Sequence, residues 1–264
     1  MANKTMSSED LADLRYAKSL LENPSLAARI ANVVGVPIEK FIERLPEGAR
    51  EVIRTATTKS LEAALAFATS TMDDRRQGAA NWAHKIVVAA TGAAGGAFGL
   101  PALAIELPVS TIIMLRSIVD IARSEGERIK SPEAKLACLE VFALGGRARS
   151  DDAAGSSYFA VRGVLAKALA EAAEYIVERG VAQETAPPLI RLIAQIAARF
   201  GVPVSEKAMA QSLPIVGAAG GALINTLFID HFQDVGRGHF IVRRLERTYG
   251  PELVRRAYLN IPSR

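Results

Sequence analysis

Apolar residues recur at helical spacing along most of the chain. Near the N-terminus Leu11, Leu14 and Leu21 share one side of a helix that Ser7 or Ser8 can cap. The same spacing recurs in residues 26–34, 38–45, 47–70, 132–144, 156–179, 186–200, 240–245 and 253–258. No run shows the sustained two-residue alternation of a strand followed by a hairpin turn. The pattern predicts an all-α protein, with an exposed loop inside one domain at residues 145–157, where the sequence is small, polar and rich in glycine.

Two stretches depart from this amphipathic pattern because they carry no charge. Residues 86–105 and 208–229 are each about as long as a membrane-spanning helix, which needs roughly 20 residues. Both contain the hexapeptide GAAGGA, which sets two glycines one helical turn apart and lets a second backbone approach closely. The predicted helix-packing glycines are Gly92, Gly96, Gly99, Gly217 and Gly221.

Two interpretations of these stretches remain open. They can be Gly/Ala-rich helices or hairpins at the centre of a single-domain helical bundle, or they can enter a bilayer. Pro101, Pro108 and Pro214 interrupt the segments, and the mean hydropathy of +0.17 is modest for an integral protein. These observations favour a buried core or a reversible membrane contact over stable spanning.

Composition and motifs exclude several classes of chemistry. A single cysteine and three histidines in 264 residues argue against a disulfide framework and against a metal site, so we expect no metal and no cofactor. Neither a His-Glu-x-x-His helix nor a Gly-x-Ser-x-Gly elbow occurs, and no glycine run has the context of a nucleotide loop. Cys138 lies in an apolar helical run and is predicted to be a small buried residue. We therefore identify no catalytic residue.

Glycines and isolated polar residues carry a resemblance to a known family. In the first half these residues are Gly92, Gly96, Gly99, Glu106, Leu107, Pro108, Arg116 and Gly126. In the second half they are Tyr158, Arg162, the stretch 213–225, Phe240, Arg243, Arg244, Leu245 and Glu246. This pattern resembles the EcsC protein family of bacteria over roughly residues 40–255. It suggests an N-terminal helical extension over 1–40 and an EcsC-like domain over 41–264.

The resemblance implies no defined biochemical role, and the expectation of membrane contact comes from the uncharged stretches and the basic C-terminal segment. The family takes its name from a gene that neighbours an ABC transporter in some bacteria. A non-enzymatic protein that associates with membrane or lipid, as an accessory to a membrane transport or secretion complex, is the function that we expect. A membrane protein is then a possible partner. Some members are labelled peptidases, but the residues here give that label no support.

Polar residues in apolar surroundings form the candidate polar site, which consists of Glu106, Arg116, Arg162, Asn225, Asp230 and His231. Glu106 is either a proton or ligand site or half of an ion pair with Arg116 or Arg162, since an unpaired buried carboxylate is costly. Arg116 and Asp120 can pair along one face, and Asn225 can hydrogen-bond between helices. The alternative functions are a hydrolase that uses Glu106 with Asp230 and His231, and a soluble protein-interaction module.

Positive charge is concentrated near the C-terminus. Residues 235–264 contain seven arginines and two glutamates, a local charge of +5 directly after the second uncharged stretch. Arg243, Arg244 and Arg247 are the predicted contacts to anionic lipid headgroups. No aromatic platform accompanies the charge, so nucleic acid is not expected. The N-terminal sequence lacks the pattern of a secretory signal, and we expect a cytoplasmic protein, peripheral or partly inserted at the inner face of the cell membrane.

Overall fold

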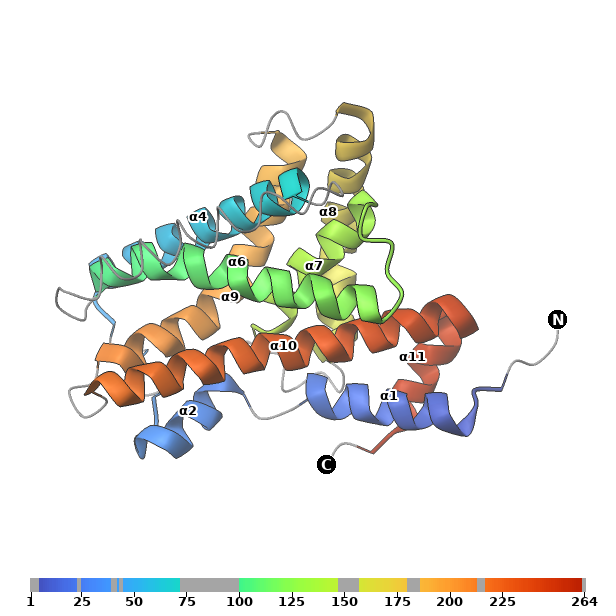
Figure 1. Cartoon of the computed structure of the whole chain (residues 1–264), viewed down its shortest axis with the longest axis horizontal. Coiled ribbons are helices and arrows are strands. Elements are labelled where there is room, and N and C mark those ends of the chain that lie inside the picture. The colour runs from blue at the N-terminus through green and yellow to red at the C-terminus, as the bar shows by residue number, and fades with distance from the viewer. Residues whose placement is uncertain are drawn as a thin grey trace.

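A computed structural model describes residues 5–22, 25–38, 42, 45–71, 100–146, 157–179, 186–212 and 217–262. Within these ranges the secondary structure is helical, with nine helices and no strand, in one body (Figure 1). The helices are α1 Ser8–Leu21, α2 Leu26–Val34, α4 Glu47–Thr71, α6 Leu100–Ser124, α7 Pro132–Leu144, α8 Ser157–Arg179, α9 Pro187–Ser212, α10 Gly217–Tyr249 and α11 Pro251–Asn260. The prediction of an all-α fold is confirmed.

Local sequence signals explain several helix boundaries. The Ser7 hydroxyl accepts a hydrogen bond from the Asp10 amide at 3.1 Å and caps α1. Ser131 caps α7 in the same way, and Pro132 occupies the first turn, where its missing N–H costs nothing. Gly35 ends α2 with a φ of 73°, a left-handed conformation that favours glycine.

Two helices run through prolines, and one of these, Pro108, was expected from the sequence to be an interruption. Helix α6 continues past Pro108, and α9 extends twelve residues beyond the predicted end at Phe200, through Pro203. A proline removes one backbone hydrogen bond, but burial of the neighbouring apolar side chains outweighs that loss. Leu107 and Val204, next to these prolines, are fully buried. The described residues of the second uncharged stretch thus lie in two helices, at the end of α9 and the start of α10.

Helix α10 is the long axis on which the other helices pack. It contacts α1, α2, α6, α7, α9 and α11 (Figure 1). Helices α6 and α10 run in parallel, because Gln233 donates to Ser117 and Arg243 donates to Glu127, two contacts that both join residues 116 positions apart. The start of α6, the start of α10 and the end of α9 therefore lie at the same end of the molecule (Figure 1).

Aromatic rings fill the core between α7, α9 and α10. Phe142, Phe200, Phe228 and Phe232 are fully buried, and their ring centroids lie 4.9 to 6.2 Å apart. Tilted and edge-on contacts of this kind add to the apolar burial. Cys138 is also fully buried, as predicted, and burial raises the pKa of its thiol to about 12.

Three expectations about segments have different outcomes. Gly145 and Gly146 are buried, so the predicted loop at 145–157 is not exposed at its start, and residues 147–156 lie outside the described ranges. Most of the short helix predicted at 38–45 also lies outside them. Helix α1 packs on α10, although the division of the chain at residue 40 stays a prediction.

Candidate functional site

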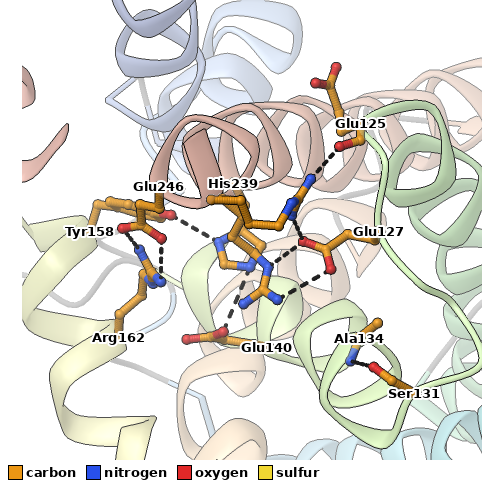
Figure 2. Close-up of polar contacts among 11 residues, drawn as sticks. Glu125, Glu127, Ser131, Ala134, Glu140, Tyr158, Arg162, His239 and Glu246 are labelled. Atoms are coloured by element: carbon orange, nitrogen blue, oxygen red, sulfur yellow. Dashed lines mark hydrogen bonds and ion pairs between the residues drawn. The ribbon is translucent and has the colours of Figure 1, made fainter. Parts of the chain in front are cut away.

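A chain of three buried polar side chains crosses the interior between α7, α8 and α10 (Figure 2). The hydroxyl of Tyr158 on α8 lies 3.0 Å from Nδ1 of His239 on α10. Nε2 of the same imidazole lies 3.7 Å from Oε2 of Glu140 on α7 and has no hydrogen-bond partner. If the hydroxyl donates to Nδ1, the ring proton lies on Nε2 and faces the carboxyl group.

Burial sets the protonation of this chain. It raises the pKa of Glu140 to about 7, although the charges of Arg162 and Arg243 act in the opposite direction. It lowers the pKa of His239 well below 6.5, and the same two arginines add to that effect. It also raises the pKa of Tyr158, so the phenol keeps its proton. A neutral imidazole thus lies between a protonated phenol and a carboxyl group that titrates near neutrality.

Two ion pairs lie beside this row of polar side chains, and each pair includes one residue of α10 (Figure 2). Arg162 binds Glu246 through two parallel hydrogen bonds of 2.7 and 3.0 Å, and both side chains are largely buried. Arg243 donates to both oxygens of Glu127 at 2.7 and 3.3 Å. Paired, hydrogen-bonded groups of this kind are the form in which charges are tolerated inside a protein.

Chemically, a carboxyl, an imidazole and a hydroxyl in line are the parts of an acid–base relay. Tyr158, His239 and Glu140 are only 0–4% exposed, however, so a substrate cannot reach them in this conformation. Among the described residues no group of three potential metal ligands of the His, Cys, Asp or Glu type converges. The arrangement therefore acts as a polar link that fixes the register of three helices.

The arginines predicted to meet lipid headgroups instead bind carboxylates of the protein. Arg243 pairs with Glu127, and Arg247 pairs with the same carboxylate and with the carbonyl of Glu125. Arg244 binds Asp13 and the carboxylate of Glu125, with Asp10 at 3.7 Å. Contact between these arginines and lipid would require the ion pairs to break, and their role as headgroup contacts stays a prediction.

Glu106 pairs with neither arginine that the sequence suggested. Its Oε1 accepts a hydrogen bond from Nζ of Lys207 on α9 at 2.8 Å, and the ammonium lies 4.8 Å from the centre of the Phe228 ring. Arg162 binds Glu246, and Asp120 binds Arg123 at 2.8 Å in place of Arg116. The expectation of an ion pair at Glu106 was thus right in kind and wrong in its partner.

Asn225, His231 and the nearby Asp234 each bind a different partner. The amide of Gln211 donates to Asn225 at 3.3 Å, which confirms the predicted contact between helices. His231 donates from Nε2 to the carbonyl of Gly145 at 2.8 Å. Asp234 lies 3.6 Å from Arg29 of α2. Because Glu106 binds Lys207 and His231 binds the carbonyl of Gly145, these contacts do not form the acid–base pair that the hydrolase alternative requires.

Two helices approach closely at Gly238, a glycine that was not among the predicted helix-packing glycines. A Cβ at Gly238 would lie 2.7 Å from Cγ of Leu21 and 2.9 Å from the carbonyl of Ala17, so α1 can cross α10 only at a glycine. No described atom lies within 4 Å of such a Cβ at Gly221. Gly92, Gly96 and Gly99 lie outside the described residues, as does the environment of Gly217, and glycine-to-glycine packing stays a prediction.

The sequence of the chain matches the model of a known protein family. The model of the EcsC protein family matches residues 9–245, most of the chain. The chain belongs to the EcsC protein family. The match starts within α1 and thus includes most of the segment expected to be an extension. No curated protein and no solved structure matches.

Two residues of this EcsC chain were missed from the sequence, Lys207 and Glu140. Lys207 is the last charge before the uncharged stretch 208–229, and Glu140 interrupts an apolar helical run, so an isolated charge in apolar sequence was the available signal.

The hydropathy of the described helices bears on membrane spanning. None of them combines the length and the apolar character needed to span a bilayer.

Proposed function

We propose that this EcsC protein attaches to a membrane surface through one end of its helical body, without an enzymatic step. We call this the apolar end and define it by exposed or half-exposed residues at the starts of α6 and α10. These residues are Ala104, Ile105, Val109 and Ile113 of α6, and Ala222, Leu223 and Thr226 of α10.

The exposure of large apolar side chains is the observation that carries the proposal. Ile105 is 52% exposed, Ile113 is 46% exposed and Leu223 is 43% exposed. The parallel offset of 116 residues between α6 and α10 would set Leu223 level with Leu107, which lies between Ile105 and Ile113 along α6. Apolar residues that gather at one end, and do not scatter singly, are typical of an interaction surface.

Charge is nearly absent from the starts of α6 and α10. In the described part of α6 before Arg116 the single charged residue is Glu106, and in α10 the first is Asp230. The uncharged sequence 86–99 leads directly into α6, and the equally uncharged 213–216 leads into α10. A surface that lacks charges loses little hydration when it enters the headgroup region.

The strength of such an attachment follows from the area involved. Full burial of one Leu or Ile side chain contributes about 1.5–3 kcal/mol, and these side chains are already half buried in the protein. Three of them support a weak, reversible attachment in which the helices lie at the interface. This agrees with helices too short or too polar to span, and with the inner-face location expected from the sequence.

Cosedimentation with lipid vesicles tests the proposal. The double variant Ile105→Asp, Leu223→Asp should lose binding to neutral phosphatidylcholine vesicles that the parent chain shows. The matched control is Val164→Asp, Val177→Asp, which changes two valines that are 72% and 66% exposed on α8, away from the apolar end in Figure 1. Equal binding by the two double variants, or no binding by the parent chain, would contradict the proposal.

A further inference from the structure

Glu106 lies within the apolar end, where an ionised carboxylate would oppose membrane contact. It is seven residues from Ile113, which places both on one face of α6 two turns apart, and it is next to Ile105 in sequence. Its side chain is 36% exposed, so Glu106 is not enclosed by the protein. Charged groups are among the most costly to move toward the hydrocarbon of a bilayer.

Lys207 approaches this carboxylate from the protein interior. Its side chain is 1% exposed, and its Nζ lies 2.8 Å from Oε1 of Glu106 and over the ring of Phe228. Burial lowers the pKa of Lys207, while the charge and hydrogen bond of Glu106 act to raise it. An ammonium and a carboxylate in direct contact carry no net charge as a pair.

The position of the lysine is unusual for a merely structural ion pair. Burial of a charge without a partner is destabilising, and a buried pair is often no better than two apolar residues. Here only the lysine is fully buried, whereas 36% of the Glu106 side chain is exposed, next to residues that the proposed function assigns to lipid. Lys207 therefore neutralises the charge of Glu106 at the apolar end, and the cost is the burial of its own ammonium group.

We propose that Lys207 is the positioning and neutralising partner that makes Glu106 compatible with membrane contact at the apolar end. This inference rests on the proposed function. Without Lys207, the carboxyl group would lie beside Ile105 and Ile113 with no cation to offset its charge, which would oppose contact of the apolar end with lipid. As in the proposed function, the bound surface is a lipid bilayer, and its lipids need not be anionic.

Vesicle binding of three variants tests the inference. Lys207→Met keeps the volume and the apolar stem of the lysine but leaves Glu106 unpaired, and binding to neutral phosphatidylcholine vesicles should fall about tenfold, equivalent to about 1.4 kcal/mol. The double variant Glu106→Gln, Lys207→Met should regain the parental binding. Lys167→Met is the matched control, because Lys167 lies 3.8 Å from Glu171 on α8, remote from the apolar end, and its binding should not change.

Thermal unfolding of each variant separates folding from binding. If Lys207→Met does not fold, the exchange Glu106→Lys, Lys207→Glu replaces it, and this net-neutral pair should bind as the parent does. Parental binding by folded Lys207→Met, or loss of binding by the folded exchange variant, would overturn the role of the pair alone. A parent chain that binds no vesicle would overturn both this inference and the proposed function.

Discussion

The carboxylate of Glu127 lies between two arginines of α10, with Nε of Arg243 at 2.7 Å and Arg247 on the same oxygen. Only 6% of the Glu127 side chain is exposed. Burial alone would raise the pKa of Glu127, but hydrogen bonds and charge from Arg243 and Arg247 outweigh burial and hold that pKa below its usual range. The positive C-terminal segment thus serves to fasten α10 to the connection between α6 and α7.

Removal of one of these arginines should therefore affect stability more than lipid binding. Arg243→Gln should lower the free energy of unfolding by roughly 2 kcal/mol, because a charge-assisted hydrogen bond is lost while Glu127 keeps Arg247. Urea denaturation measures this change, and Arg116→Gln, at an exposed position, is the control. Reduced binding to anionic vesicles with unchanged stability would instead support the headgroup role expected from the sequence.

Stability should depend on pH through Glu140. Its pKa is raised from 4.5 to about 7 in the folded protein, so its contribution is fully present below pH 4.5 and is lost as the pH rises through 7. The change amounts to about 3 kcal/mol at most. His239 has a lowered pKa and acts in the opposite sense, with a contribution that is lost as the pH falls below 6.5.

The variant Glu140→Gln isolates this effect, because the His239 contribution remains in both proteins. Unfolding free energies measured from pH 5 to pH 8 should show the parent chain losing stability relative to the variant as the pH rises. A difference between the two proteins that stays constant across this range would show that Glu140 does not titrate there.

Two glycines in helices should respond oppositely to alanine. Gly163→Ala should stabilise the protein by up to about 1 kcal/mol, since alanine has the higher helix propensity and nothing described lies within 4 Å of the new Cβ. Gly238→Ala should destabilise it by roughly 1–3 kcal/mol, because the new methyl group meets Leu21 and the backbone of Ala17. A melting temperature of Gly238→Ala that equals or exceeds that of the parent chain would contradict the close crossing of α1 and α10.

A double-mutant cycle on Arg162 and Glu246 should reveal strong coupling. Either Arg162→Met or Glu246→Gln leaves a largely buried charge unpaired, at a cost of about 3–5 kcal/mol. The double variant should cost less than the sum of the two single changes. Additive effects in urea denaturation would mean that the bidentate pair contributes no coupling.

Helix positions were readable from the sequence, because caps and apolar spacing act locally. Ser131 and Pro132 place the start of α7, and Gly35 places the end of α2. Helix α9 was predicted too short, since the apolar spacing indicated a helix only to Phe200, while burial of the residues around Pro203 depends on helices distant in sequence.

The polar contacts were less predictable for the same reason. Glu106 was recognised as a residue that needs a partner, but Lys207 lies 101 positions away, and only the packing of α6 on α9 brings the two together. The charge of +5 in residues 235–264 suggested a free basic surface. The acidic residues that bind its Arg243, Arg244 and Arg247 lie in other parts of the chain, at Asp13, Glu125 and Glu127.

Fluorescence at a single labelled position tests most directly whether the apolar end meets the membrane. Leu223→Cys carries an environment-sensitive dye, and Cys138 is fully buried and should not react. With neutral vesicles, we expect a blue shift of the dye and quenching by a quencher attached to the lipid tails. The same dye at Val177→Cys on α8 should show neither change. An unshifted, unquenched dye at position 223 while the protein sediments with vesicles would contradict attachment through this end.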